Sequence, residues 1–330
     1  SIFSFYNRIK RVGYASPKCM FELYKCLTQP ILLYGSDLFG SSSKSIASLD
    51  LLLNWYLRMV LCVKNGTCKP MLYGESGVVP PSILCHQNVI LYYIRLNNLP
   101  HGSVLKSVFL EMKDLCDSAT TNNWCSNVLK LACSYNLDIN DLEFSDSTKQ
   151  YIKNEIKQRF ISDWLSKIND SFNNPGLRLY KLLKFEFRCE PYLQNVKIFK
   201  HRKMFTKLRT NSHLLEIEHG KHLGKLAHDR LCTVCHVVED EFHFVMVCPL
   251  YNELRNNFLA EITSMFPLLN QYSLHDKFLF LMGFDDNNLH CMISKFVYNA
   301  FNVRSDLGLT LPSSGDLCRS PGGGGSPSQN

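Results

Sequence analysis

Apolar side chains recur at intervals of three and four residues through most of the chain, the spacing of one face of an α-helix. The clearest run lies within residues 147–171, where every fourth position is large and apolar: Ile152, Ile156, Phe160, Trp164 and Ile168. Similar stripes predict helices at residues 46–63 and 82–99, and Ser16 followed by Pro17 is a typical helix start. The pattern therefore predicts a mostly α-helical, multi-helix assembly.

Proline and glycine are expected to divide these helices. Pro30 should kink or end the helix that starts at Pro17, and MLYGESGVVPP (residues 71–81) is expected to be a Gly/Pro-rich link. A basic amphipathic helix is predicted at residues 195–210, and residues 215–217 alternate like a short strand, which suggests one small strand pair. Three further helices are expected at residues 249–266, 275–282 and 289–307.

Composition and pattern together divide the chain into four parts. Of its 330 residues, 45% are hydrophobic, which is ample for a buried core and excludes a globally disordered chain. We expect a helical region at residues 1–110 and a helical linker at residues 111–195. Residues 196–311 hold the basic helix, a cysteine-rich segment and the last helices, and residues 312–330 form a Gly/Ser/Pro-rich flexible tail.

One cysteine-rich segment has the spacing of a metal site. Most of the 14 cysteines lie within apolar helical patterns, where a free cysteine behaves as a small hydrophobe. The segment CTVCHVVEDEFHFVMVC instead forms a C-x2-C-x7-H-x4-C array of Cys232, Cys235, His243 and Cys248. Four protein ligands complete a tetrahedron, so the array predicts one structural zinc ion and no catalytic metal.

Other side chains around the array admit more than one interpretation. His236 can replace His243 as a ligand, although its position directly after Cys235 would strain the loop. Phe242 and Phe244 either stack on bases or form a small core, and we expect core for at least one of them. A second metal site is conceivable at four nearby histidines, although loop histidines beside a basic helix are the favoured interpretation: His213, His219, His222 and His228.

Positive charge is concentrated in residues 197–230. Nine basic residues there face three acidic ones, so that nine minus three gives +6 of the net charge of +7. Such asymmetry predicts a polyanionic partner, RNA or DNA, whose phosphates these side chains would contact. The nine residues are Lys197, Lys200, Arg202, Lys203, Lys207, Arg209, Lys221, Lys225 and Arg230. The alternative interpretation of such a run is a solvated polar face.

No sequence feature indicates a membrane or secretory protein. The chain does not open with a signal-peptide pattern, and no apolar run reaches the length of a transmembrane helix. Together with the location of most cysteines in apolar helical patterns, this favours a reducing intracellular setting, nuclear or cytoplasmic.

Three blocks of the sequence resemble the C-terminal part of the reverse-transcriptase protein of non-LTR (LINE-type) retrotransposons. The first reads PILLYGSDLFG (residues 30–40) and is similar to the family's segment beyond the polymerase palm. The second reads KMFTKLRTNSHLLEIEHGKH (residues 203–222), similar to the block before the family's CCHC zinc knuckle. The third reads RLCTVCHVVEDEFHFVMVCPLYNELR (residues 230–255) and is similar to that knuckle and the helix after it. The blocks follow the family's order.

The resemblance implies that this chain has no active centre of its own. It makes residues 1–110 a thumb- and connector-like region, and places the polymerase palm with its paired aspartates upstream of Ser1. The nearest look-alike, Asp285-Asp286, is expected to be a helix-connecting turn, and no Pro-Asp pair of a restriction-like nuclease follows Cys248. The implied role is holding template RNA and target DNA during target-primed reverse transcription. The alternative is a domesticated or decayed remnant, a zinc-stabilised protein-interaction module.

Overall fold

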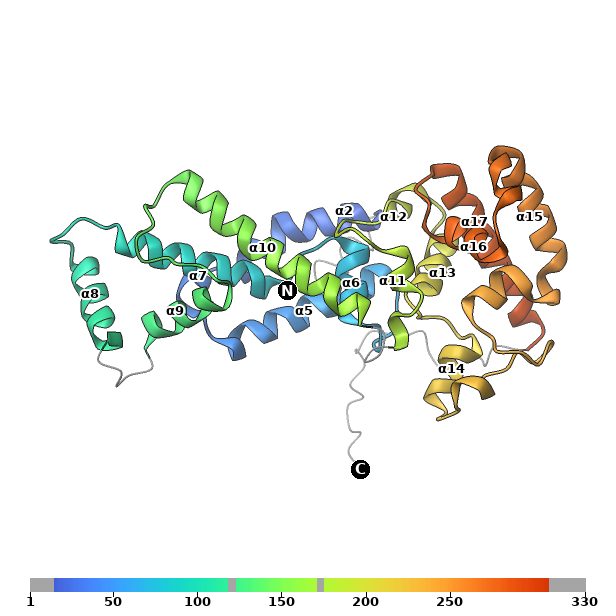
Figure 1. The fold of residues 1–330 in the computed structure, drawn as a ribbon, viewed down its shortest axis with the longest axis horizontal. Coiled ribbons are helices and arrows are strands. Elements are labelled where there is room, and N and C mark those ends of the chain that lie inside the picture. Colours follow the sequence, from blue (N-terminus) through green and yellow to red (C-terminus); the bar gives the residue numbers. More distant parts are fainter. Residues whose placement is uncertain (1–14, 118–122, 171–174, 309–330) are drawn as a thin grey trace, which may run out of the picture. The chain divides into compact units, whose positions relative to one another are not determined.

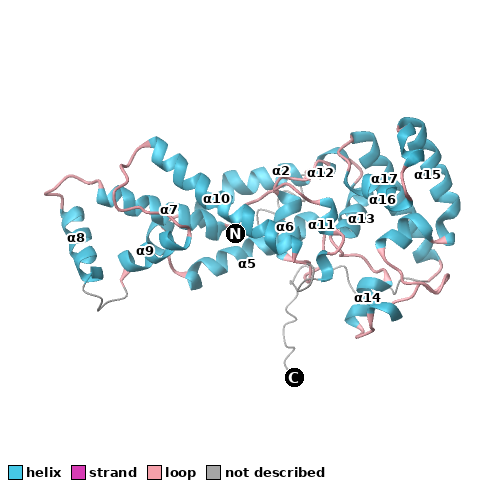
Figure 2. Cartoon of the chain, in the orientation of Figure 1, coloured by secondary structure: helices cyan, strands magenta, loops and turns pink. Residues whose placement is uncertain are grey.

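The computed structural model describes residues 15–117, 123–170 and 175–308. Within these ranges the chain is 71% helical, with sixteen α-helices and no sheet, which confirms the mostly α-helical prediction. Figure 2 shows only helices and loops in this part of the chain. None of the described helices combines the length and the apolar character needed to cross a bilayer. The predicted tail at residues 312–330 lies outside the described residues.

The chain groups into two compact units. The first comprises Ser1–His213 and Tyr272–Ser294, and the second comprises Leu214–Gln271 and Lys295–Asn330. This grouping follows contacts between residues. The division at residues 110, 195 and 311 stays a prediction.

The first unit holds most of the helices (Figure 1). These are α2 (Pro17–Leu23), α3 (Gln29–Leu32), α4 (Ser36–Phe39), α5 (Ser43–Leu61), α6 (Lys69–Ser76), α7 (Pro81–Asn97), α8 (Val104–Asp117), α9 (Trp124–Ser134), α10 (Asp146–Asn169), α11 (Tyr180–Leu183), α12 (Tyr192–Asn195), α13 (Phe199–Arg209) and α16 (Leu274–Gly283). The last helix, α17 (Asn287–Asp306), contributes its first residues to this unit and its remainder to the second.

Helix α7 forms the centre of one core of the first unit. It packs against α4, α5, α8, α9 and α10. Its buried Val89 and Tyr93 belong to one apolar cluster with Phe109 of α8 and Ile152 and Ile156 of α10. The four-residue stripe recognised in the sequence of residues 147–171 is therefore the face by which α10 joins the core, as its periodicity predicts.

Pro30 neither ends its helix nor leaves it regular. The chain stays helical from Pro17 to Leu32, but residues Tyr24–Thr28 form a π-helical turn, in which Gln29 N–H bonds to Tyr24 O. Proline has no N–H to donate and its ring crowds the carbonyl four residues earlier. The widened turn directly before Pro30 accommodates both effects, which the sequence rule for proline alone does not specify.

The prediction that residues 71–81 form a link is wrong for their first half. Residues Lys69–Ser76 form helix α6, and its Glu75 is fully buried. A Cβ at Gly74 would lie 2.4 Å from Tyr180 Oη, and one at Gly77, whose φ is +64°, would lie 2.4 Å from Cys189 N. Both glycines are thus required by close packing, and at Gly77 by backbone conformation as well. The sequence does not reveal this packing role of the two glycines, because it depends on the distant residues Tyr180 and Cys189.

The second unit surrounds the cysteine-rich segment with three helical pieces. These are α14 (Glu216–His222), α15 (Asn252–Met265) and the second part of α17. The strand predicted at residues 215–217 is absent, because Glu216 begins α14. The extended pairing that does exist in the described part of this unit is one antiparallel bridge between Leu231 and Val238. Phe258 of α15 stacks on Phe296 of α17 with ring centroids 4.8 Å apart.

His86 on α7 is expected to make the stability of the protein pH-dependent. Its Nδ1 lies 2.7 Å from Tyr135 Oη, and burial lowers its pKa to about 4. A histidine in an unfolded chain titrates near pH 6.5, so above about pH 7 the side chain is neutral in both states. As the pH falls from about 6.5 to about 4, protonation favours the unfolded chain, and about 1–3 kcal/mol of stability is lost.

Urea unfolding of the wild type and of His86→Gln at several pH values between about 4.5 and 7.5 measures this loss. The stability advantage of the wild type over the variant should shrink as the pH falls. A difference that does not change with pH would contradict the assignment to His86.

Candidate metal centre and basic segment

Four side chains of the second unit converge on one point. The ligand atoms of Cys232, Cys235, His243 and Cys248 all lie within 4.8 Å of one another. The three pairs of sulfur atoms are 3.6 to 3.9 Å apart. For metal–sulfur bonds of about 2.3 Å, the edge of a tetrahedron is about 3.8 Å. The cluster can therefore hold one metal ion, and it includes His243 rather than His236.

The first two cysteines are positioned by a tight turn. Cys232 N–H bonds to Val237 O at 2.7 Å, and His236 N–H bonds back to Cys232 O at 2.9 Å. Between these bonds the chain reverses, with His236 in the left-handed conformation at φ +57°. The turn directs both sulfur atoms to one side. His236 itself is exposed and serves the turn through its backbone.

The last two ligands are brought together by a π-helical turn, residues His243–Val247. Cys248 N–H bonds to His243 O at 2.8 Å, a bond between residues five apart. In a regular α-helix, the residue one turn beyond His243 would be Val247, four positions later, and not Cys248. Here the wider turn accompanies the H-x4-C spacing and His243 and Cys248 converge, and π turns of this kind are frequent at functional sites. Asp240 fixes its start, since its Oδ1 accepts from His243 N–H at 2.7 Å.

Arg255 of α15 stabilises this turn through hydrogen bonds to two backbone oxygens. Its Nε donates to Val245 O at 2.8 Å and its Nη2 donates to Cys248 O at 2.6 Å. Phe244 is fully buried against Tyr251 and Phe301, with ring centroids 4.8 and 4.6 Å away. Phe244 is thus part of a small core, as expected for at least one of the two phenylalanines. No pattern in the sequence indicates this role of Arg255.

A buried ion pair joins the cysteine-rich segment at residues 232–248, called the metal segment below, to the last helix. Glu239 is 1% exposed and pairs with Arg304 of α17, which is 2% exposed. The other carboxylate oxygen of Glu239 accepts from Glu216 N–H at 2.8 Å, at the start of α14. Burial raises the pKa of Glu239, while Arg304 acts in the opposite direction. One carboxylate therefore connects the metal segment, α14 and α17 within the second unit.

The donor set fits a soft or borderline divalent cation. His243 is 5% exposed, and its Nε2 has no hydrogen-bond partner in the described part of the chain. Burial lowers the pKa of His243, which favours the neutral imidazole that ligates metals. Burial raises the pKa of the Cys248 thiol to about 12, so a cation is what would hold this side chain as a thiolate. Among the described residues no other group of three or more His, Cys, Asp or Glu side chains meets the same geometric criterion, so the four histidines do not form a second cluster.

The nine predicted nucleic-acid contacts are divided between the two units. Six lie on or next to α13 in the first unit, and the other three lie in the second. Lys197 and Lys200 are exposed, and Lys203 and Lys207 are half-buried. Lys221 and Lys225 are exposed, and Lys225 forms an ion pair with Glu216 at 2.9 Å. Arg230 is half-buried and donates to Ile217 O at 2.9 Å.

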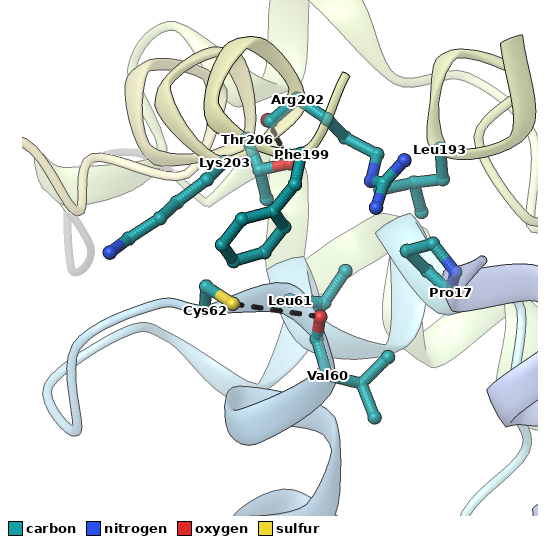
Figure 3. A pocket seen from close by; sticks show the side chains of 9 residues that line it. All are labelled: Pro17, Val60, Leu61, Cys62, Leu193, Phe199, Arg202, Lys203 and Thr206. Carbon is teal, nitrogen blue, oxygen red and sulfur yellow. Dashed lines mark hydrogen bonds between the residues drawn. The ribbon is translucent and has the colours of Figure 1, made fainter. Parts of the chain in front are cut away.

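Two of the nine, Arg202 and Arg209, are buried and do not fit the prediction that they contact phosphates. Arg202 is 4% exposed and donates to Val196 O at 2.6 Å. In Figure 3 the Arg202 side chain extends from α13 towards Leu193 and Pro17, whereas the Lys203 side chain leaves the same helix towards the left of the view. Residues that differ by one position on a helix point about 100° apart, which the count of charges in a segment does not take into account.

Arg209 belongs to an ion network inside the first unit. It is 2% exposed, and its guanidinium lies 3.3 Å from Glu75 and 2.8 Å from Glu190. Tyr192 Oη donates to Glu75 at 2.5 Å, and Lys184 forms an ion pair with Glu190. Burial acts to raise the pKa of both carboxyls; at Glu190 the two cations outweigh it and hold the pKa below its usual value.

The Asp285-Asp286 pair is a connecting turn between α16 and α17, as expected. Asp286 Oδ1 accepts from Leu289 N–H at 2.9 Å at the start of α17. Asp285 lies 3.4 Å from Arg188 in an exposed ion pair.

No family model matches the chain, and no curated protein or solved structure is significantly similar to it.

Proposed function

We propose that this chain is a nucleic-acid-binding module organised around one structural zinc ion. It resembles the C-terminal region of a non-LTR retrotransposon reverse transcriptase and would hold template RNA and target DNA. On this proposal it is not an enzyme by itself, and polymerase and nuclease centres lie on other parts of a longer protein. The observation that carries the proposal is the convergence of Cys232, Cys235, His243 and Cys248, the ligands of the motif on which the resemblance rests.

Zinc is the metal that best suits this donor set. Three thiolates and one imidazole in a closed tetrahedron are typical of structural zinc, because this ion accepts sulfur and nitrogen ligands without a geometric preference of its own. All four positions are taken by protein side chains, so the ion would fold the segment and would leave no site for substrate. Its role would be to fix the chain between α14 and α15.

Nucleic-acid binding is supported by the lysines that remain accessible. Lys197 and Lys200 are exposed at the start of α13, and Lys221 is exposed on α14. Lysine side chains in such positions attract phosphates through a long-range, salt-dependent interaction. Because α13 and α14 belong to different units, each group is proposed as a contact in its own right.

A protein-interaction module is the alternative, and one observation favours it. The second unit exposes large aliphatic side chains around the metal segment: Leu223 at 61%, Leu226 at 63%, Val234 at 44% and Val237 at 49%. Aliphatic side chains cannot stack on bases as aromatic rings do, and exposed apolar groups are typical of protein contacts.

Binding across a salt series distinguishes the two functions. We expect the protein to bind structured RNA and duplex DNA with an affinity that falls linearly with log salt concentration. Lys197→Gln together with Lys200→Gln should reduce the slope by about one per lost phosphate contact. The measurement is fluorescence anisotropy with labelled RNA and DNA between about 0.05 and 0.3 M salt, with and without chelator.

The matched control removes two exposed lysines elsewhere, Lys44 on α5 and Lys295 on α17, by the same change to glutamine. This control has the same net charge as the test variant, and its slope should stay close to that of the wild type. Absence of binding by the wild type, or binding without a salt slope, would leave the protein-interaction module as the better proposal.

A further inference from the structure

Helix α10 carries a four-residue repeat that involves neither the metal centre nor the basic segment. Residues 149–160 read KQYI, KNEI and KQRF in succession. Because an α-helix has 3.6 residues per turn, positions four apart lie on neighbouring turns of the same side. The repeat therefore sorts the helix into four rows, which are Lys149/Lys153/Lys157, Gln150/Asn154/Gln158, Tyr151/Glu155/Arg159 and Ile152/Ile156/Phe160.

The apolar row and the lysine row have opposite environments. Ile152 and Ile156 are fully buried in the core beside α7. Lys153 and Lys157 are exposed, as are all three amides of the second row. Lys149 at the head of the row is half-exposed above the Phe144 ring, 4.5 Å from its centroid. The long helix, labelled α10 in Figure 1, thus presents a continuous polar surface over three turns.

Within the helix, two of the three charges of the lysine row have no acidic partner. Lys149 pairs with Asp146 at 2.8 Å, but Lys153 and Lys157 have no acidic residue three or four positions away. Neither forms an ion pair with any residue of the described part of the chain. Like charges four residues apart repel each other and disfavour the helix. A row of this kind is therefore most stable when an anion lies along it.

We infer that this face of α10 is a second contact surface for the sugar-phosphate backbone of a nucleic acid. The inference rests on the proposed function and adds a site within the first unit that is separate from residues 197–230. Successive lysines lie about 6 Å apart along the helix axis, so that three ammonium groups extend over about 12 Å. Lysine and side-chain amides are both donors to phosphate oxygens, and here each lysine is followed directly by an amide.

The composition of this face favours nucleic acid over an acidic protein. Protein interfaces are centred on buried aromatic or aliphatic anchors and are depleted in lysine. The lysine and amide rows contain no apolar side chain. Tyr151 of the neighbouring row is 50% exposed and can stack on a base.

The test is the double variant Lys153→Gln/Lys157→Gln in the full chain. Binding of labelled single-stranded RNA and of duplex DNA is followed by anisotropy over a salt series. Two lost phosphate contacts should lower the slope of log affinity against log salt by about 1.4 on single strands and about 1.8 on duplex. At 0.1 M salt the affinity should fall roughly 25- to 60-fold. Glutamine forms helix about as well as lysine, so the circular dichroism should be unchanged.

Two further variants isolate the role of charge. Lys153→Arg/Lys157→Arg keeps both charges and should keep the slope, and the Lys44→Gln/Lys295→Gln control loses two charges elsewhere. If the wild type binds with a salt slope but the α10 double variant behaves like this control, the inference is overturned and the proposed function stands. If the wild type does not bind, both fail. Poly-L-glutamate that competes as well as RNA, charge for charge, would overturn the assignment to a nucleic-acid backbone.

Discussion

Replacing Cys232 with serine is expected to abolish metal binding and to unfold the segment at residues 215–250, while the first hundred residues keep their structure. Structural zinc contributes about 10–16 kcal/mol of apparent binding free energy in small sites, which is comparable to or larger than the stability of most domains. Loss of one thiolate removes most of this free energy. Hydrogen exchange read by peptide, together with elemental analysis of zinc per chain, measures both effects.

Cys133 provides the matched control for this variant. It is an exposed cysteine on α9 of the first unit, and Cys133→Ser should keep one metal ion per chain and the exchange pattern of the wild type. Treating the wild type with a strong chelator should reproduce the Cys232→Ser pattern. Equal loss of protection in residues 215–250 and in the first hundred residues would contradict a metal with a local role. A purified wild type without zinc would remove the zinc proposal.

Arg209→Met is expected to destabilise the first unit by about 3–5 kcal/mol, because it leaves a buried carboxylate without its cation. Glu75 is fully buried and depends on Arg209 for charge compensation, whereas Glu190 keeps Lys184. In the variant Glu75 can respond by taking up a proton. A carboxyl whose folded pKa is raised loses stability as the pH rises, so the destabilisation should be larger at about pH 8 than at about pH 5.

Urea unfolding gives this difference, with Lys200→Met on the same helix as the control. Lys200 is exposed, and its replacement should change the stability by less than about 0.5 kcal/mol. Under conditions where Arg209→Met is folded, the salt slope of nucleic-acid binding should match the wild type, because a buried guanidinium does not reach phosphates. A loss of slope in this variant without a loss of stability would show that Arg209 contacts the ligand after all.

The four residues of the candidate metal cluster were predictable from the sequence because they lie close together along the chain. All four lie within 17 residues, and two local turns bring them together. The residues that hold those turns were not predictable in the same way. Arg255 bonds to Val245 O and Cys248 O, and Glu239 pairs with Arg304, which lies 65 residues away. An isolated arginine on a helix carries no pattern that distinguishes such a role from an exposed position.

Burial of individual basic side chains at residues 197–230 was likewise not predictable from the sequence. The sequence shows an excess of positive residues in this segment, but it does not separate accessible from buried side chains. Lys200 is exposed, whereas Arg209 on the same helix is buried beside Glu75, a residue 134 positions away. Burial of a charge depends on whether a distant part of the chain supplies the opposite charge, and no local pattern records that.

The sequence by itself determined the helical class of this protein, the boundaries of its long helices to within a few residues, and the four clustered ligands. Each of these follows from interactions between residues close together in the chain, for which periodicity and spacing are direct evidence. Tertiary structure alone decided that residues 69–76 form a packed helix, that Pro30 follows a π turn, and that two of nine basic residues lie inside. These outcomes depend on packing and charge compensation between segments far apart in the sequence, which no local pattern records.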